Sequence, residues 1–291
     1  MVDEVLSVLK PLPGEIAVDC TLGHGGHASR LLQAVQPGGK LIALDTDPIE
    51  LPKAEARLRA TGCEPDSLVV VRSNFAGLAH TLAVHAASGV DMLLADLGLS
   101  SMQIDDPKRG FSYKHDGPLD MRMNPLKGLS ASEWIARISL PDLVHQLTEN
   151  ADEPQAEPLA RAILQAQTRS PLTTTQALVA IIRRVMSNNS EATSSATVQR
   201  VFQAIRIAVN DEFGALEAFL RQVPTCMKPG GRIAILSFHS GEDRRVKSAF
   251  KLGLASGAFA RISEDVIRTS YIEQHANPRS ASAKLRWAIC V

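Results

Sequence analysis

Short apolar runs alternate with amphipathic stretches along the first part of the chain. Two of these stretches, residues 27–35 and 49–60, carry apolar side chains at helical spacing, and Pro52 falls early in the second, where a helix tolerates it. The apolar runs are residues 16–20, 41–45, 68–72 and 91–97. Strands that alternate with helices in this way are typical of βαβ units, so the pattern predicts a parallel sheet.

Polar or aromatic side chains stand at the predicted carboxyl end of each of these four runs. They are Asp19, Asp45, Asn74 with Phe75, and Asp96. Ligands of parallel sheets bind beyond the carboxyl ends of the strands. Because the four ends are expected to meet at one edge, these side chains predict a binding crevice there.

A glycine-rich turn containing Gly25 and Gly26 follows the first predicted strand, and the second predicted strand ends on Asp45. This arrangement is typical of adenosine binding, because the glycines let the backbone approach the ligand and an acid about 20 residues on can accept both ribose hydroxyls. The dinucleotide motif G-x-G-x-x-G would need a glycine where the chain has Ala28 or Ser29. The spacing favours an adenosine without a pyrophosphate, such as S-adenosyl-L-methionine. The alternative is a strand-turn-helix whose glycines only make a tight corner.

The alternation of strands and helices stops after Asp96. A glycine- and proline-punctuated stretch leads to a capping box at Ser130 and Glu133, which predicts the start of a helix. Further helical segments are predicted at 159–167, 175–186 and 198–220, with a loop at 188–195, and the strand pattern returns at 232–238 and 285–291. The helix around 211–222 is expected to belong to the sheet domain again. The sequence thus predicts an α/β domain made of residues 1–106 and 208–291, with a helical substrate-recognition domain inserted at 107–207, a length typical of a small domain.

Composition narrows the class of protein. The chain has 31 Lys and Arg against 31 Asp and Glu, but residues 228–291 hold 11 basic side chains against 5 acidic ones. That local excess suits contact with phosphates, although scattered solvated charges explain it equally well.

The four cysteines form no C-x-x-C pair, and no cluster at ligand spacing predicts a metal site. Neither a signal peptide nor a membrane-spanning run is recognisable, which favours the cytoplasm and no membrane partner.

Several collinear tracts carry a specific family resemblance. They are residues 96–105 (DLGLSSMQID), 109–112 (RGFS), 116–123 (DGPLDMRM), 202–212 (FQAIRIAVNDE), 237–240 (SFHS) with 242–244 (EDR), 277–279 (NPR) and 282–286 (SAKLR). Together they closely resemble the bacterial small-subunit rRNA (cytosine-N4)-methyltransferase family over nearly the whole chain. One departure is Gly241, where the family customarily has leucine, and a local loosening is expected there.

The resemblance implies a Rossmann-like, seven-stranded S-adenosyl-L-methionine-dependent methyltransferase sheet with a helical insert. It implies an enzyme that methylates the exocyclic amine of a cytidine in the decoding centre of small-subunit ribosomal RNA. The implied partner is that RNA or the assembled small ribosomal subunit, and a homodimer is compatible with the sequence.

By the same resemblance, the cofactor is expected against Gly25, Gly26, His27, Asp45, Phe75, Asp96 and Gln103. Asp45 would hold the ribose and Phe75 would cover the adenine with its ring face. His27 could donate to the methionine carboxylate or only begin its helix, and Asp19 could stand near the methionine ammonium. Asp96 is the candidate catalytic residue, as the acceptor of the amine proton, as a cofactor contact, or as an acid that only caps its turn.

Contacts with RNA are expected from basic residues in the matched segments. The candidates for phosphate contact are Arg206, Arg279, Lys284 and Arg286, each of which could instead be a solvated surface charge. The loop at residues 108–123 contains Phe111 and Tyr113. These rings could grip an extruded base, or they could plug the joint between sheet and insert.

Two other classes of function compete with an RNA methyltransferase. A small-molecule methyltransferase would share the sheet, but the large insert and the basic C-terminal segment disfavour it. A non-catalytic ribosome-assembly factor would keep the fold without turnover. The intact set of Gly25, Gly26, Asp45, Phe75 and Asp96 argues against that loss.

Overall fold

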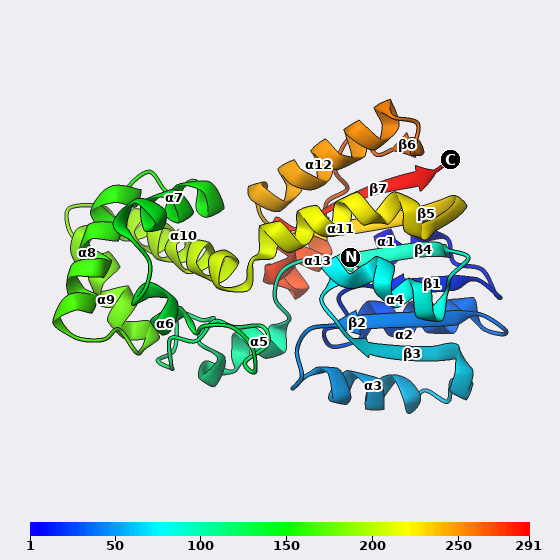
Figure 1. Cartoon of the computed structure of the whole chain (residues 1–291), viewed down its shortest axis with the longest axis horizontal. Helices are drawn as coiled ribbons and strands as arrows, with labels where there is room; N and C mark the ends of the chain where they lie inside the picture. Colours follow the sequence, from blue (N-terminus) through cyan, green and yellow to red (C-terminus); the bar gives the residue numbers. More distant parts are fainter. The chain divides into compact units, whose positions relative to one another are not determined.

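A computed structural model describes residues 1–291 and places seven strands in one sheet of order β3-β2-β1-β4-β5-β7-β6 (Figure 1). The strands are β1 (Ile16–Asp19), β2 (Lys40–Asp45), β3 (Leu68–Arg72), β4 (Val90–Asp96), β5 (Met227–Ser237), β6 (Phe259–Ile262) and β7 (Lys284–Cys290). The first five strands pair in parallel. The Rossmann-like sheet that the resemblance implies is therefore confirmed, and so are the six strands predicted from apolar runs.

The far edge of the sheet differs from the purely parallel pattern. Strand β7 runs antiparallel to both β5 and β6. The sequence pattern also missed β6, because this strand has only four residues and its middle two, Ala260 and Arg261, are exposed. Such a short segment shows no apolar alternation from which a strand can be predicted.

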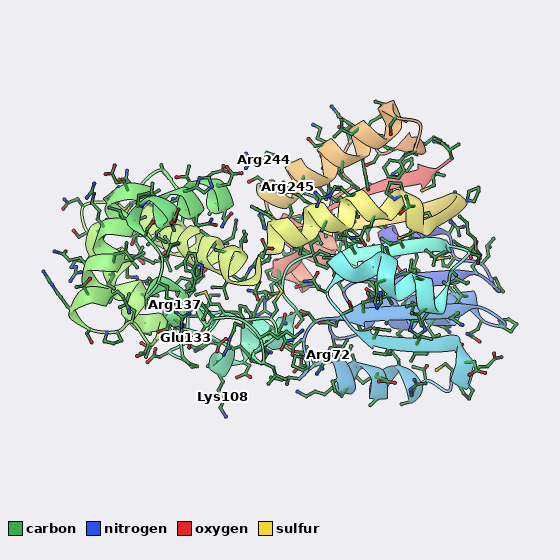
Figure 2. All side chains as sticks on the ribbon, in the orientation of Figure 1. Arg72, Lys108, Glu133, Arg137, Arg244 and Arg245 are labelled. Carbon is green, nitrogen blue, oxygen red and sulfur yellow. The ribbon has the colours of Figure 1, made fainter.

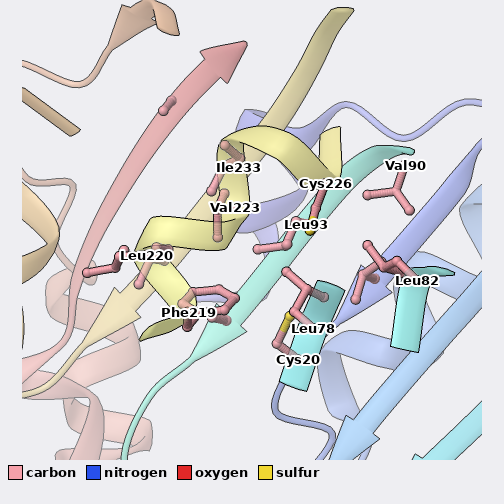
Figure 3. Close-up of a cluster of buried hydrophobic side chains, with 14 of the residues drawn as sticks. Cys20, Leu78, Leu82, Val90, Leu93, Phe219, Leu220, Val223, Cys226 and Ile233 are labelled. Atoms are coloured by element: carbon pink, nitrogen blue, oxygen red, sulfur yellow. The ribbon is translucent and has the colours of Figure 1, made fainter. Parts of the chain in front are cut away.

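Helices cover both faces of the sheet. One face packs against α1 (Val2–Leu9), α2 (Gly26–Val35) and α3 (Leu51–Arg59), and the other against α4 (Leu78–His85), α11 (Glu212–Cys226) and α12 (Ser240–Ala255). Side chains along each strand alternate between the two cores, so that Leu93 belongs to one and Leu94 to the other. Figure 3 shows the core beneath α4 and α11, where Phe219 is fully buried among Leu78, Leu93 and Val223. Helix α13 (Tyr271–Ala276) lies between β6 and β7 in the chain, and short 3-10 helices occur at Pro65–Ser67, Phe75–Gly77, Pro107–Arg109 and Pro278–Ser282.

The chain forms two compact units, one made of Met1–Gly98 with Phe213–Val291 and the other of Leu99–Glu212. The helical domain was expected at 107–207, and both of these boundaries lie inside the second unit, which therefore extends further at each end. Its helices are α5 (Ser101–Asp105), α6 (Ala131–Ile135), α7 (Leu140–Ala151), α8 (Ala156–Arg169), α9 (Thr175–Val185) and α10 (Glu191–Asn210). They enclose a separate core, which includes the fully buried Leu147, Ile163 and Ile205.

The capping box predicted at the start of α6 is present. The hydroxyl of Ser130 accepts a hydrogen bond from the Glu133 N–H at 3.3 Å, and the Glu133 carboxylate accepts one from the Ser130 N–H at 2.8 Å. These reciprocal bonds satisfy donors that have no partner inside the helix. Glu133 and Arg137 extend from this part of the helical unit (Figure 2).

The helical spacing predicted over 198–220 covers two helices in the structure, and the second of them, α11, confirms the helix expected around 211–222 in the sheet domain. Helix α10 ends at Asn210, and Asp211 takes a left-handed conformation with φ 49° before α11 begins. Aspartate tolerates that conformation better than most residues, whereas the apolar spacing runs on through the break and hides it. The predicted loop at 188–195 is also shorter than expected, because Ser190 caps α10 by accepting from the Thr193 N–H at 3.2 Å.

The expected loosening at Gly241 is not found. A side-chain carbon at this position would lie 2.6 Å from Cζ of Phe213, so the Phe213 ring occupies the space above the glycine. None of the helices is both long and apolar enough to cross a membrane.

Candidate active site

Three acidic side chains end neighbouring strands at one edge of the sheet. Strand β1 lies between β2 and β4, and Asp19 is in register with Ala43 of β2 and Leu94 of β4. Asp45 and Asp96 each come two residues later on their strands. The parallel register therefore brings the ends of three strands together, although these residues lie far apart in the sequence.

The glycine-rich turn is tied to the end of β2 by Asp45. One carboxylate oxygen of Asp45 accepts from the Gly23 N–H at 2.7 Å, and the other accepts from the Asp47 N–H at 2.9 Å. Gly25 sits at the start of α2 with φ 89°, a conformation that favours glycine. A carboxylate can accept about four hydrogen bonds in all, so Asp45 keeps capacity to accept from a ribose hydroxyl. Burial raises the pKa of Asp45 against the opposing hydrogen bond from Asp47.

Thr21 links the two other acids. Asp19, only 1% exposed, accepts from the Thr21 N–H at 3.0 Å and from its hydroxyl at 3.4 Å. The same hydroxyl oxygen accepts from the backbone N–H of Asp96 at 2.6 Å. Burial raises the pKa of Asp19 to about 7, more than the Thr21 hydrogen bond lowers it.

Asp96 has one carboxylate oxygen without a partner. Its Oδ1 is buried and makes no hydrogen bond, whereas 32% of the whole side chain stays exposed. Burial raises the pKa of Asp96 to about 7, and the nearby charge of Asp19 raises it further, while the terminal amine of Met1 opposes both. Buried acceptors without partners are uncommon in folded proteins, so this oxygen indicates a place for a donor from outside the chain.

His27 faces the same acid. Its Nε2 lies 3.6 Å from Oδ2 of Asp96, and its Nδ1 is buried without a hydrogen-bond partner. One interpretation of His27 was that it only begins helix α2. The helix has no side-chain cap, so His27 does not satisfy the backbone groups at its start. Burial lowers the pKa of His27 to about 4, which keeps the imidazole neutral near pH 7.

The end of β5 supplies a fourth acid that the sequence did not single out. Glu242, on the first turn of α12, accepts from the Phe238 N–H at 2.8 Å and is 3% exposed. Its Oε1 lies 3.2 Å from Nε2 of His239. The charge of Glu242 contributes to the raised pKa of Asp96. Two signals in the sequence could have indicated these residues as part of the site. Glu242 lies in the family-matched region after β5, and Thr21 lies inside the glycine-rich turn.

Phe75 stands at the carboxyl end of β3. The side chain of Asn74 accepts from the Ala76 N–H at 2.8 Å and fixes the short helix that carries Phe75. The ring packs edge-on against Phe219, with centroids 5.3 Å apart and planes at 68°, and remains partly exposed. Its contact with an adenine stays a prediction.

Gln103 differs from the other candidates because it belongs to the helical unit. Its side-chain oxygen accepts from the Ser100 N–H at 3.0 Å in a capping box, and the residue is 7% exposed. Its contact with a cofactor stays a prediction.

Most of the basic candidates are engaged with acids. Arg206 makes a two-pronged ion pair with Glu212, at 2.7 and 2.9 Å. Arg286, which is 6% exposed, binds Asp243 at 2.7 and 3.3 Å, and Lys284 lies 3.8 Å from the same carboxylate. Their contact with phosphates stays a prediction, as does that of the exposed Arg279.

The aromatic side chains of the loop at 108–123 pack inside the helical unit. Phe111 is buried, with the guanidinium of Arg109 at 5.6 Å from its ring centroid. Tyr113 meets Phe202 edge-on at 5.7 Å. Both rings join the core of that unit, which favours a packing role over capture of an extruded base.

Comparison with known proteins gives one family across the chain. The family model described as the MraW methylase family matches residues 1–290. A relative from Lachnoclostridium phytofermentans, named ribosomal RNA small subunit methyltransferase H 1, is 45% identical over 293 residues, which cover 99% of this chain and 80% of the relative. A second, from Granulibacter bethesdensis, is named ribosomal RNA small subunit methyltransferase H and is 39% identical over 310 residues, covering 100% and 90%. A solved S-adenosylmethionine-dependent O-methyltransferase from Thermotoga maritima aligns at 12% identity and a TM-score of 0.46, over 100% of this chain and 64% of that one.

Proposed function

The chain belongs to the MraW methylase family, and on that premise we propose that it methylates the exocyclic N4 amine of a cytidine in small-subunit ribosomal RNA. It is a methyltransferase that uses S-adenosyl-L-methionine. The names of the relatives favour ribosomal RNA as the substrate over a small molecule, and an enzyme over a non-catalytic assembly factor. Its partner is then the RNA or the assembled small subunit, its place the cytoplasm, and a homodimer stays a prediction.

The unpartnered oxygen of Asp96 is the observation that carries the proposal for cytosine. A buried carboxylate oxygen at the end of β4 is suited to accept a hydrogen bond from an amine, and a cytosine amine has two such hydrogens. The neighbouring acid, Asp19, is already engaged by Thr21, so Asp96 is the acid left to take a donor from a substrate.

The residues around Asp96 fit the cofactor. S-adenosylmethionine carries a sulfonium and an ammonium, which need negative charge nearby, and the site has Asp19, Asp45 and Asp96. Asp45 would hold the ribose, Phe75 the adenine, and the orphaned Nδ1 of His27 would bond the methionine carboxylate. When bound, the cofactor supplies an electrophilic methyl group.

The chemistry assigned to this chain is positioning and proton transfer. The lone pair of a cytosine amine is delocalised into the ring, so the amine must be held in line with the methyl group and its electrons localised. Asp96 does this by accepting a hydrogen bond from the amine. After transfer the amine carries one proton too many, and Asp96 takes it. A pKa raised to about 7 makes this carboxylate a competent base near neutral pH.

Labelled cofactor and small ribosomal subunits from a strain that lacks the modification test the proposal. We expect label in the RNA, and digestion to nucleosides should give N4-methylcytidine by mass spectrometry. Asp96→Asn should bind cofactor but transfer at least about 100-fold more slowly, the range typical of a lost general base. Glu55→Gln, on the outer surface of α3, is the matched control and should transfer normally. Label at the ring carbon or on the ribose would contradict the assignment of the N4 amine.

A further inference from the structure

The charge around the proposed cofactor site is unbalanced. Acids and bases from six helices and strands, together with the terminal amine, lie around it. Their charges contribute to the pKa shifts of Asp19, His27 and Asp96. They are Asp19 from β1, Asp45 from β2, Asp96 from β4, Glu242 with His239 from α12, His27 from α2, Glu273 from α13 and the terminal amine of Met1 before α1. The terminal amine is paired with Glu273, and His27 is neutral near pH 7 because burial lowers its pKa to about 4. The remaining groups are carboxylates, with His239 as the one imidazole among them.

No lysine or arginine neutralises the three acids at the strand ends. Asp19 and Asp45 accept only from neutral donors, which are Thr21 for the first and backbone N–H groups for the second. Several acids elsewhere in this unit are paired with cations, as Asp91 is with Lys228 at 2.7 Å and Asp243 with Arg286 at 2.7 Å. The site thus keeps negative charge that no lysine or arginine compensates, and the terminal amine, itself paired with Glu273, offsets only part of it.

The methyl donor and its product differ in charge. S-adenosylmethionine has a sulfonium, an ammonium and a carboxylate, so its net charge is +1. S-adenosylhomocysteine has lost the sulfonium charge and is neutral overall. A carboxylate cluster that lacks a lysine or arginine partner distinguishes these two ligands, most of all through the buried Asp19, because Coulomb interactions are less screened away from water.

We propose that Asp19, acting with Asp96, makes this site select the cationic methyl donor over its neutral thioether product. The inference rests on the proposed function and deepens it. Asp19 is the specificity-determining residue, since it is nearly inaccessible and has no cation of its own. The selection clears the product after each transfer, because the site loses its compensating charge when the methyl group leaves.

The selection depends on pH in a defined direction. Burial raises the pKa of Asp19 and of Asp96 to about 7, so both are partly protonated at pH 7 in the empty site. A cationic ligand favours their ionised forms and releases protons on binding. Affinity for the cation should therefore rise as pH rises from about 6 to about 8, and affinity for the neutral product should change less.

Calorimetry on the full chain with three ligands tests the selection. The ligands are S-adenosylmethionine, S-adenosylhomocysteine, and sinefungin, in which a carbon bearing an amine replaces the sulfonium with its methyl. For one carboxyl with a pKa near 7, the dissociation constant of a cation should fall about tenfold between pH 6 and pH 8. The constant for S-adenosylhomocysteine should fall less than about threefold. Sinefungin should follow S-adenosylmethionine, which separates charge from the methyl group itself.

Asp19→Asn supplies the second arm. The amide oxygen keeps the acceptor for the Thr21 N–H, the negative charge is lost, and the second carboxylate oxygen becomes an NH2 donor. We expect the preference for S-adenosylmethionine over S-adenosylhomocysteine at pH 8 to fall at least about fivefold, which corresponds to about 1 kcal/mol. Glu55→Gln removes one negative charge from α3, where Glu55 pairs with Arg59 at 2.8 Å, and should leave the preference unchanged.

The outcomes separate this inference from the function beneath it. Equal affinities for the three ligands at both pH values, with RNA still labelled, would overturn the selection and leave the methyltransferase intact. An unchanged preference in Asp19→Asn would overturn the role of Asp19. Failure of all three ligands to bind would overturn both. If Asp19→Asn does not fold, the three ligand profiles of the unmodified chain decide the question.

Discussion

The hydroxyl oxygen of Thr21 accepts a 2.6 Å hydrogen bond from the backbone N–H of Asp96, and so joins the turn after β1 to the end of β4. The same hydroxyl donates to Asp19 at 3.4 Å, and the backbone N–H of Thr21 donates to that carboxylate at 3.0 Å. One short side chain therefore fixes the two acids that the proposed chemistry uses. Thr21 acts through these acids and is a positioning residue.

Thr21→Val should weaken both the fold and the reaction. Valine keeps the shape of threonine but leaves the Asp96 N–H without an acceptor, which costs about 1–3 kcal/mol when the donor is buried. We expect a lower midpoint in urea denaturation, and methyl transfer with a reduced kcat and a nearly unchanged KM for RNA. Thr21→Ser retains the hydroxyl and should restore kcat. A serine variant as slow as the valine variant would show that the hydrogen bond is not what matters.

The rate of transfer should follow the ionisation of Asp96. Because burial and the charge of Asp19 raise its pKa to about 7, the carboxylate is protonated below that pH and cannot accept the amine proton. The value of kcat/KM in single-turnover labelling should therefore rise with pH and level off above about pH 8. Asp96→Asn should abolish this rise along with most of the rate. A flat profile in the unmodified chain between pH 6 and pH 8 would exclude Asp96 as the base.

Asp19 should destabilise the empty protein at high pH. Its pKa is about 7 in the folded chain and about 3.9 when unfolded, so the folded state binds the proton more tightly. Stability is unaffected below about pH 4, falls as pH rises through the window between the two pKa values, and bears the full cost above about pH 7. Asp19→Asn should stabilise the protein by a few kcal/mol at pH 8 and by much less at pH 5. Urea denaturation of both chains at the two pH values measures this, and a difference that does not vary with pH would contradict it.

The strand ends were predictable because local pattern encodes them. Each of Asp19, Asp45 and Asp96 follows an apolar run that is long enough for a buried strand, and parallel strands must present these ends at one edge. The Ser130 capping box was predictable for a similar reason, because its two residues are only three positions apart and the pattern is local.

What the sequence could not supply are the pairings between distant residues. Asp243 and Arg286 lie 43 positions apart, and nothing local shows that their charges meet and that Arg286 is thereby buried. The Thr21–Asp96 bond spans 75 positions. The break at Asp211 was hidden for another reason, because apolar spacing continues across a single residue in the left-handed conformation.

Gly241 and Phe213 should be coupled in stability. The Phe213 ring lies between His239, with ring centroids 5.8 Å apart, and the guanidinium of Arg245, at 3.6 Å from the ring centroid. A β-carbon at residue 241 would stand 2.6 Å from this ring, so Gly241→Ala should cost about 1–3 kcal/mol by overpacking, measured in urea denaturation. In a Phe213→Leu background the shorter side chain leaves room, and the same substitution should cost less than about half as much. The control is Gly26→Ala, because nothing lies within 4 Å of a β-carbon at Gly26 and the variant shows the effect of an added methyl group alone. Gly257→Ala is unsuitable, because the positive φ of 79° at Gly257 would add backbone strain. Equal costs of Gly241→Ala in the two backgrounds would show that the Phe213 ring does not limit the space above Gly241.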